Sequence, residues 1–248
     1  MSYKANKEEL LHFIRNYEYK EEQPEVVMEA VNNYIKLIDF AGDRTGDQEN
    51  TDILESCLEG LLKINEKMQK GNFRYRLKVR DNLVTFGQLL HKNNRDFYTL
   101  NFIPTLNDFY SGLEGDAKFT LAEALVTLGI SNENYIRHLT SVMQAPKEKK
   151  VSFWRKYGAA VALMQINDKN AHDYLFAEMQ PYKKNRLTAA MLLGEVMVRD
   201  NAIIPEKAGL QKVIDCLKEG IRENPNKFQR DYANAVLARL SEARAVPK

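Results

Sequence analysis

Basic residues recur at one kind of position in this 248-residue sequence, near the start of a predicted amphipathic helix. They are Arg76, Lys78, Arg80, Lys118, Arg155, Lys156, Lys183, Lys184, Arg186, Lys227 and Arg230. Ammonium and guanidinium groups bind carboxylates and phosphates, so helices stacked in register would present a ladder of cations to an acidic ligand. We name these residues the basic ladder and expect it to bind an acidic segment of another protein. The alternative is a structural role, in which each cation pairs with acids of a neighbouring turn.

Trp154 is the only tryptophan, and it lies beside Phe153, Arg155, Lys156 and Tyr157. An exposed tryptophan among cations would be an anchor for a binding partner. A buried tryptophan would fill the core between helices instead, and we expect this second arrangement. Trp154 nevertheless joins the basic ladder in the set of candidate binding residues.

The sequence contains no catalytic motif: we find no glycine-rich phosphate loop, no HExxH, no CxxC and no Gly-x-Ser-x-Gly. Its histidines and cysteines are far apart along the chain, at His12, His91, His138 and His172 and at Cys57 and Cys216. Both cysteines fall in amphipathic helical patterns, which favour a buried thiol over a disulfide or a redox centre. We therefore expect no catalytic residues, no metal site and no cofactor.

The composition is that of a folded protein, with 44% hydrophobic and 28% charged residues. A net charge of only +2 argues against a strongly cationic nucleic-acid binder, although a local basic stripe remains compatible with it. No apolar run is long enough to span a bilayer, and residues 1–9 lack the apolar core of a secretory signal. These features predict a cytoplasmic protein that does not contact a membrane.

The apolar residues repeat with a helical period almost everywhere, which predicts an all-α fold of about twelve helices and no β-sheet. The predicted helices span 7–19, 24–41, 52–69, 73–91, 96–110, 116–129, 132–144, 152–166, 170–179, 183–199, 206–223 and 227–243. Pro104 should kink or split the fifth of them. The polar stretch 42–50 is the longest predicted loop, either a mobile insertion or a boundary.

One segment has an ambiguous pattern. Residues 73–80 alternate apolar and basic side chains, as a half-buried strand does. We predict a helix there, because the stripe Val79, Leu83, Phe86 and Leu90 continues from it at helical spacing and no partner strand is visible.

Similar segments recur at intervals that suit two-helix repeats. Residues 83–87 match residues 125–129 at four of five positions, 42 residues apart, and residues 124–139 align with residues 160–175 at a shift of 36. The stretch 185–194 places Arg186 before paired alanines and ends in Leu-Gly, and Arg230 likewise stands three residues before an alanine. Small side chains at these positions would let neighbouring helices approach closely.

These segments resemble the second helices of HEAT-like repeats of the armadillo-type superfamily, over roughly residues 73–243. The resemblance implies a right-handed α-solenoid whose second helices line a concave face. It makes residues 1–248 a single domain, with an irregular helical cap at 1–72 and HEAT-like repeats at 73–248. HEAT-like proteins include scaffolds, transport adaptors, bilin lyase subunits and alkyl-DNA glycosylases, so the resemblance implies no particular chemistry.

The function we expect is that of a non-enzymatic scaffold or adaptor that binds an acidic protein segment on its concave basic surface. A first alternative is a nucleic-acid-binding protein or glycosylase-like enzyme, which would use the same cations for phosphates. Asp168 and Asp173, with Trp154 and Arg186, are similar to the Trp, Asp and Arg set of the glycosylases, but their order and context differ. A second alternative is a cofactor-handling subunit like the bilin lyases.

Overall fold

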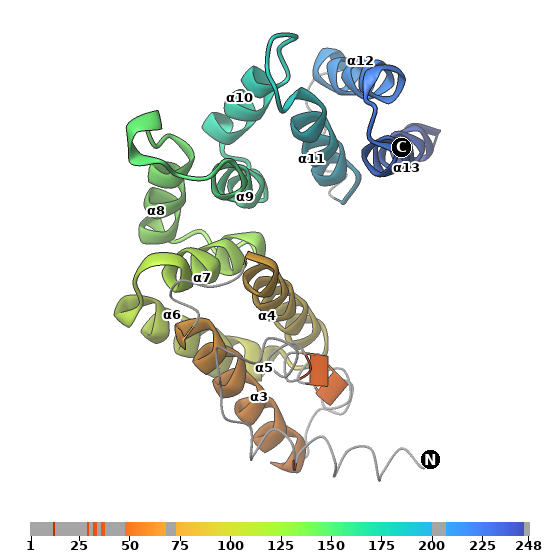
Figure 1. Ribbon diagram of the computed structural model, residues 1–248. Coiled ribbons are helices and arrows are strands. Elements are labelled where there is room, and N and C mark those ends of the chain that lie inside the picture. Colours follow the sequence, from red (N-terminus) through yellow and green to blue (C-terminus); the bar gives the residue numbers. More distant parts are fainter. Residues whose placement is uncertain are drawn as a thin grey trace. The chain divides into compact units, whose positions relative to one another are not determined.

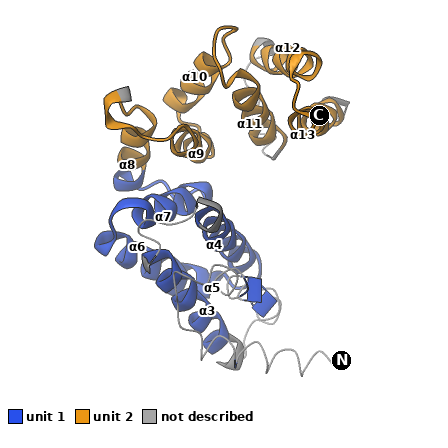
Figure 2. Ribbon diagram, viewed as in Figure 1, with its two compact units in different colours: residues 1–135 blue, residues 136–248 orange. Residues whose placement is uncertain are grey.

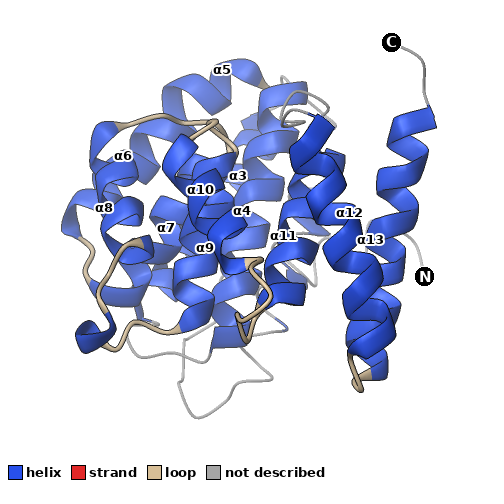
Figure 3. Cartoon of the chain, turned by 90° about the horizontal axis from the view of Figure 1, so that it is seen from above, coloured by secondary structure: helices blue, strands red, loops and turns tan. Residues whose placement is uncertain are grey.

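The computed structural model describes residues 48–67, 73–199 and 207–245, and six single residues before them (12, 29, 32, 33, 36 and 37). Over these residues the chain forms helices and turns and no strand (Figure 3), so the prediction of an all-α fold is confirmed for this part of the chain. The helices of ten residues or more number ten there, rather than about twelve. The difference arises because two predicted helices, 7–19 and 24–41, fall on a stretch with only those six described residues. The predicted loop 42–50 lies outside the described residues up to residue 47, and its last three residues are helical, so the predicted end of the loop was wrong.

The contacts between Cα atoms divide the chain into two compact units, residues 1–135 and 136–248 (Figure 2). The division falls inside one helix and not at the expected boundary near residue 72. A single domain with an N-terminal cap therefore stays a prediction, and each unit is described by itself below.

The continuously described part of unit 1 starts with two long helices and goes on through a segment that combines α-helical and π-helical turns (Figure 1). Its elements are α3 (Gln48–Lys67), α4 (Phe73–Asn93), the short α5 (Arg95–Phe97), the π-helical turn η1 (Tyr98–Phe102), α6 (Ile103–Gly112), α7 (Gly115–Thr127) and the start of α8 (Glu133–Met143). The segment 73–80 is helical, as expected. Pro104 is the second residue of α6 and directly follows the π-helical turn η1, so the predicted helix 96–110 has its α-helical hydrogen bonding interrupted at residues 98–102 but stays helical throughout.

Unit 2 consists of antiparallel helical hairpins. Its elements are the rest of α8, the 3₁₀ turn η2 (Lys147–Lys149), α9 (Phe153–Met164), α10 (Lys169–Glu178), α11 (Arg186–Arg199), α12 (Lys207–Glu223) and α13 (Lys227–Ala245). Ser152 caps α9 and Asp168 caps α10, each accepting a hydrogen bond from the backbone N–H three residues later. Because successive helices alternate in direction, α9, α11 and α13 all begin on the same side of the unit, and Figure 3 shows the connecting turns there.

The core of each unit is built on one helix that is buried nearly all round. In unit 1 this helix is α7, whose residues 119–126 are all buried against α3, α4 and α6. In unit 2 it is α11, which contacts α9, α10, α12 and α13. Its paired alanines, Ala189 and Ala190, are fully buried, as the sequence predicted. No helix of the described residues is long and apolar enough to cross a lipid bilayer.

Candidate functional site

Three cations of the basic ladder make the same contact in unit 2. Lys156 Nζ donates a hydrogen bond to the carbonyl of Ala145, just beyond the end of α8. Arg186 Nε donates to the Met179 carbonyl at 3.0 Å, and Arg230 Nη1 donates to the Asn224 carbonyl at 2.7 Å. In each case a cation at the start of the second helix reaches back to a carbonyl at the end of the first.

That contact has a structural purpose. The last carbonyls of a helix have no partner within the helix, and the helix dipole makes this end negative. A cation placed there satisfies a carbonyl and joins the two helices of one hairpin. Arg186 also donates from Nη2 to Glu219 of α12 at 2.6 Å. The hydrogen bond from Arg186 is the main reason that the pKa of Glu219 is lowered.

In unit 1 the ladder residues lie partly inside the core. The guanidinium of Arg76 is buried 4.8 Å from the centre of the Phe119 ring. Arg80 donates to Glu123 of α7 at 3.3 Å, and the Glu123 side chain is only 2% exposed. Lys118 lies 4.8 Å from the centre of the Tyr110 ring, close to the end of α6. These contacts favour the structural alternative for most of the ladder.

The buried carboxyl of Glu123 has a raised pKa. Burial is the largest cause, and the charges of Arg80 and Arg76 oppose it. Desolvation lowers the pKa of Arg80, but the carboxylates of Glu123 and Asp81 more than offset this effect and raise it. Arg80 and Glu123 thus lie together inside unit 1, where each offsets part of the cost of burying the other's charge.

The remaining ladder residues are more accessible. Lys78, Lys184 and Lys227 are exposed, and Arg155 and Lys183 are half-buried. Lys183 donates to Glu178 at 2.8 Å, which raises the pKa of Lys183. In each hairpin of unit 2, one such residue lies within three residues of a cation that bonds a carbonyl. The neighbours are Arg155 and Lys156, Lys183 and Arg186, and Lys227 and Arg230.

Trp154 is 51% exposed, so the expectation that it fills the core was wrong. Buried residues occupy most of the circumference of α9 (Tyr157, Ala159, Ala160, Ala162, Leu163 and Met164), and Trp154 lies in the first turn on the remaining side of the helix. Its ring packs edge-on against Phe153, with the ring centres 5.0 Å apart. Helical spacing relative to these residues could have placed Trp154 outside the core from the sequence.

Two further exposed aromatic residues lie at equivalent places and were missed by sequence reasoning. Tyr182 is 81% exposed in the turn before α11, and Phe228 is 80% exposed as the second residue of α13. Among the described residues only five large hydrophobic side chains are exposed, and three of them occupy the turns that open α9, α11 and α13. We name residues 144–156, 180–186 and 224–230 the hairpin-turn edge.

Positive charge is concentrated on the hairpin-turn edge. Its three segments hold ten Lys and Arg residues and one acid, Glu148. Because the whole chain has 36 Lys and Arg and 34 Asp and Glu, everything outside the edge has seven more acids than bases. The three helix N-termini at this edge add positive ends of helix dipoles. A near-neutral total charge therefore conceals a local basic surface.

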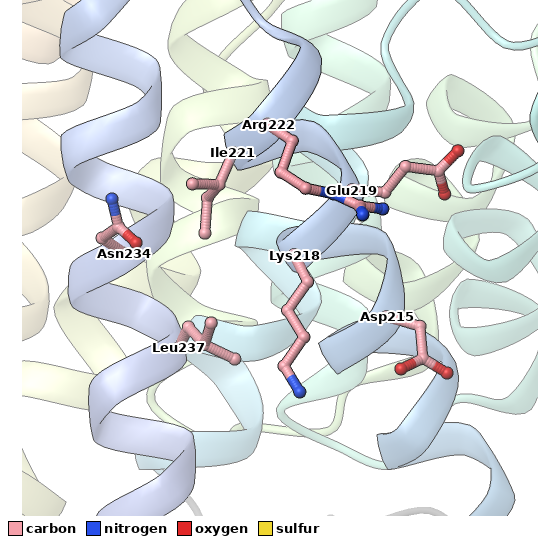
Figure 4. A pocket seen from close by; sticks show the side chains of 7 residues that line it. All are labelled: Asp215, Lys218, Glu219, Ile221, Arg222, Asn234 and Leu237. Carbon is pink, nitrogen blue, oxygen red and sulfur yellow. The ribbon is translucent and has the colours of Figure 1, made fainter.

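A groove opens between α12 and α13, with a volume of about 560 Å³ (Figure 4). The residues that line it are Asp215, Lys218, Glu219, Ile221, Arg222, Asn234 and Leu237. Asp215 and Glu219 project from the side of α12 that faces away from α13. Ile221 and Leu237 lie between the two helices.

The candidate residues for metal or thiol chemistry are the acids, histidines and two cysteines of the described segments. These segments contain no group of three or more His, Cys, Asp or Glu side chains that could hold a metal ion. Cys57 and Cys216 are buried free thiols, and burial raises the pKa of both, which disfavours the reactive thiolate. Of the set that is similar to the glycosylases, Asp168 caps α10 and Arg186 is bonded to Met179 and Glu219.

Comparisons of the chain with protein-family models, with curated proteins and with solved structures gave no match.

Proposed function

We propose that this protein is a non-enzymatic α-solenoid of HEAT-like hairpins that binds an acidic segment of another protein. The observation that carries the proposal is the hairpin-turn edge, where three exposed aromatic side chains stand among ten cations. The recurring bond from a cation to the carbonyl at the end of the preceding helix supports the repeat architecture. The binding surface is the hairpin-turn edge, because most ladder cations are occupied by internal contacts.

The chemistry of the edge defines its ligand. Exposed Lys149, Lys150, Lys184 and Lys227 are mobile point charges that suit carboxylates. Trp154, Tyr182 and Phe228 are rigid apolar surfaces that gain free energy when a partner covers them. An acidic segment with interspersed apolar residues satisfies both.

A nucleic acid is the main rival, because aromatic and basic side chains also bind single strands through stacking and phosphate contacts. The distribution of charge favours the protein. A nucleic-acid strand carries a negative charge at every nucleotide, whereas unit 2 outside the edge holds ten Lys and Arg against eleven Asp and Glu, so a strand gains no net electrostatic attraction where it extends beyond the edge over this unit. An acidic protein segment can end where the basic surface ends.

Trp154 provides a direct test, since it is the only tryptophan and lies on the proposed surface. The probe is a tryptophan-free peptide in which pairs of Glu alternate with Leu, and its control replaces every Glu by Gln. We expect the acidic peptide to change Trp154 fluorescence and to bind at least tenfold more tightly at 50 mM than at 500 mM salt, because salt screens exposed charges. The Gln peptide should bind weakly at both salt concentrations.

The matched variants are two triple charge reversals. Lys149→Glu, Lys184→Glu and Lys227→Glu should weaken the acidic peptide at least tenfold. Lys92→Glu, Lys169→Glu and Lys212→Glu change the charge equally at exposed sites outside the edge and should leave the affinity nearly intact. Equal loss in both triple variants, or tighter binding of single-stranded RNA than of the peptide, would overturn the proposal.

A further inference from the structure

The α12–α13 groove differs from the hairpin-turn edge in having an apolar floor. Ile221 of α12 and Leu237 of α13 are half-buried between the helices, and Asn234 stands beside them with an exposed amide. The volume of about 560 Å³ lies within the range of clefts that hold ligands, roughly 300–1,000 Å³. The groove can therefore accept an apolar side chain from outside.

The charges of the groove are not balanced, although two acids and two bases line it. Arg186 of α11 forms an ion pair with Glu219 at 2.6 Å, which leaves Asp215 as the one acid set against two bases. Gln211 donates a hydrogen bond to Asp215 at 2.8 Å but leaves its negative charge in place. Lys218 and Arg222 are exposed, and within the described part of unit 2 neither has an ion pair. The groove thus offers two accessible cations beside an apolar floor.

The position of the groove connects it to the hairpin-turn edge. Arg222 lies in the last turn of α12, directly before the turn that leads to Phe228. The residues of α12 that line the groove extend from Arg222 to Asp215, which is seven residues or about 10 Å along the helix. A segment bound across the edge can continue into the groove without a break.

We infer that the α12–α13 groove receives a large aliphatic side chain of the bound acidic segment, while the carboxylates on either side of that residue contact Lys218 and Arg222. This inference rests on the proposed function and adds a sequence requirement for the partner: a Leu or Ile flanked by Asp or Glu. Burial of one such side chain accounts for a tenfold or larger difference in affinity.

The test uses two tryptophan-free peptides that contain a single aliphatic position, Glu-Glu-Leu-Glu-Glu flanked by Gly and Ser, and the same peptide with Ser in place of Leu. We expect the wild-type protein to bind the Leu peptide about tenfold more tightly than the Ser peptide, as measured by Trp154 fluorescence. Leu237→Asn should abolish this preference by weakening the Leu peptide alone. Arg222→Glu should weaken both peptides, and Lys212→Glu, on the same helix but outside the groove, should weaken neither.

The outcomes separate the inference from the proposed function. If the wild type binds both peptides equally, or if Leu237→Asn retains the full preference for Leu, the groove is not the subsite and the inference is wrong. If neither peptide binds at all, the proposed function itself fails. Unfolding midpoints of the variants show that each is folded, which the partial exposure of Leu237 and the exposure of Arg222 lead us to expect.

Discussion

The helix pairs α4–α7 in unit 1 and α11–α13 in unit 2 are held by the same two devices. The first is a glycine at the point of closest approach. A Cβ atom at Gly87 would lie 2.6 Å from Leu128 Cδ1, and one at Gly194 would lie 2.5 Å from Val236 Cγ1. In both pairs the glycine of the earlier helix makes room for a side chain of the later one.

The second device is an Arg–Glu ion pair between the same helices. Arg80 pairs with Glu123 across 43 residues of sequence, and Arg239 pairs with Glu195 across 44. The side chains of Arg80 and Glu123 are 25% and 2% exposed, whereas those of Arg239 and Glu195 are 43% and 10% exposed. The same interaction is therefore more deeply buried in unit 1 than in unit 2.

This difference shows how one sequence feature takes on two roles. In unit 1 Arg76 and Arg80 of α4 lie beside the buried Glu123, so these two cations are committed to the interior. In unit 2 the corresponding cations lie at the ends of hairpins, where they bond carbonyls or remain exposed beside aromatic rings. The glycine contact recurs in the same form, whereas the ion pair is reversed: the Arg lies on the earlier helix in unit 1 and on the later helix in unit 2. The contrast in burial explains why we place partner binding on unit 2.

The largest effect is expected from Glu123→Ala in unit 1. Its removal takes the buried carboxylate away from Arg76 and Arg80 and leaves Arg80 with the exposed Asp81, and loss of one partner of a buried pair costs about 3–5 kcal/mol. Hydrogen exchange of α4 and α7 amides should report the loss. The comparison predicts a smaller cost, about 1–2 kcal/mol, for Glu195→Ala in unit 2, whose partner Arg239 is far more exposed.

Glu59→Ala is the matched control in unit 1. Glu59 forms an i,i+4 pair with Lys63 in which both side chains are 67% exposed, and such pairs contribute about 0.5 kcal/mol or less. If Glu123→Ala cost no more than Glu59→Ala, the burial argument for unit 1 would be wrong.

A second, smaller effect distinguishes the two glycines. Gly194→Ala forces a methyl group against the β-branched Val236, which is fully buried and cannot turn away. Overpacking of this kind lowers the free energy of unfolding by about 1–3 kcal/mol. The better helix propensity of Ala offsets about 1 kcal/mol of this, so we expect a net loss of stability of about 1 kcal/mol. Denaturant unfolding followed by Trp154 fluorescence measures it.

Gly87→Ala is the counterpart in unit 1. The nearest atoms there are the terminal methyl groups of Leu128, a half-buried side chain that can rotate, with the Phe102 ring at 3.0 Å. We expect a net change within about 0.5 kcal/mol, measured by hydrogen exchange of α4 and α7 amides. Equal losses at both glycines would show that the freedom of the neighbouring side chain does not decide the cost.

Periodicity was sufficient to predict the helices but not the partners of their charged side chains. The stripe of Val79, Leu83, Phe86 and Leu90 correctly outweighed the strand-like alternation at 73–80, because a helix repeats its buried face over many turns. By contrast, no sequence pattern shows that Arg186 reaches a carbonyl seven residues earlier. That contact depends on the path of the turn between the two residues.

The candidate site was predicted only in part, because its contacts also depend on the paths of the turns between helices. The basic ladder was predicted as a set of positions near the starts of helices, and the structure divides its members between buried contacts, carbonyl contacts and exposed lysines. Tyr182 and Phe228 gave no signal as single aromatic residues in sequence. Their common location with Trp154 is evident only in the structure, where alternating helix directions place the three turns on one side of unit 2.

The smallest effect concerns His172 of α10, which tests whether unit 2 responds to mild acid. Burial lowers the pKa of His172 below its usual 6.5, and Asp168 and Asp173 oppose this shift only in part. The unfolded chain therefore binds a proton at a higher pH than the folded one, so stability falls as the pH drops below about 6.5. Denaturant midpoints followed by Trp154 fluorescence between pH 7.5 and 5.5 should decline less in His172→Gln than in the wild type. The exposed His91→Gln of unit 1 should decline as the wild type does, and an undiminished decline in His172→Gln would assign the acid response of unit 2 to other groups.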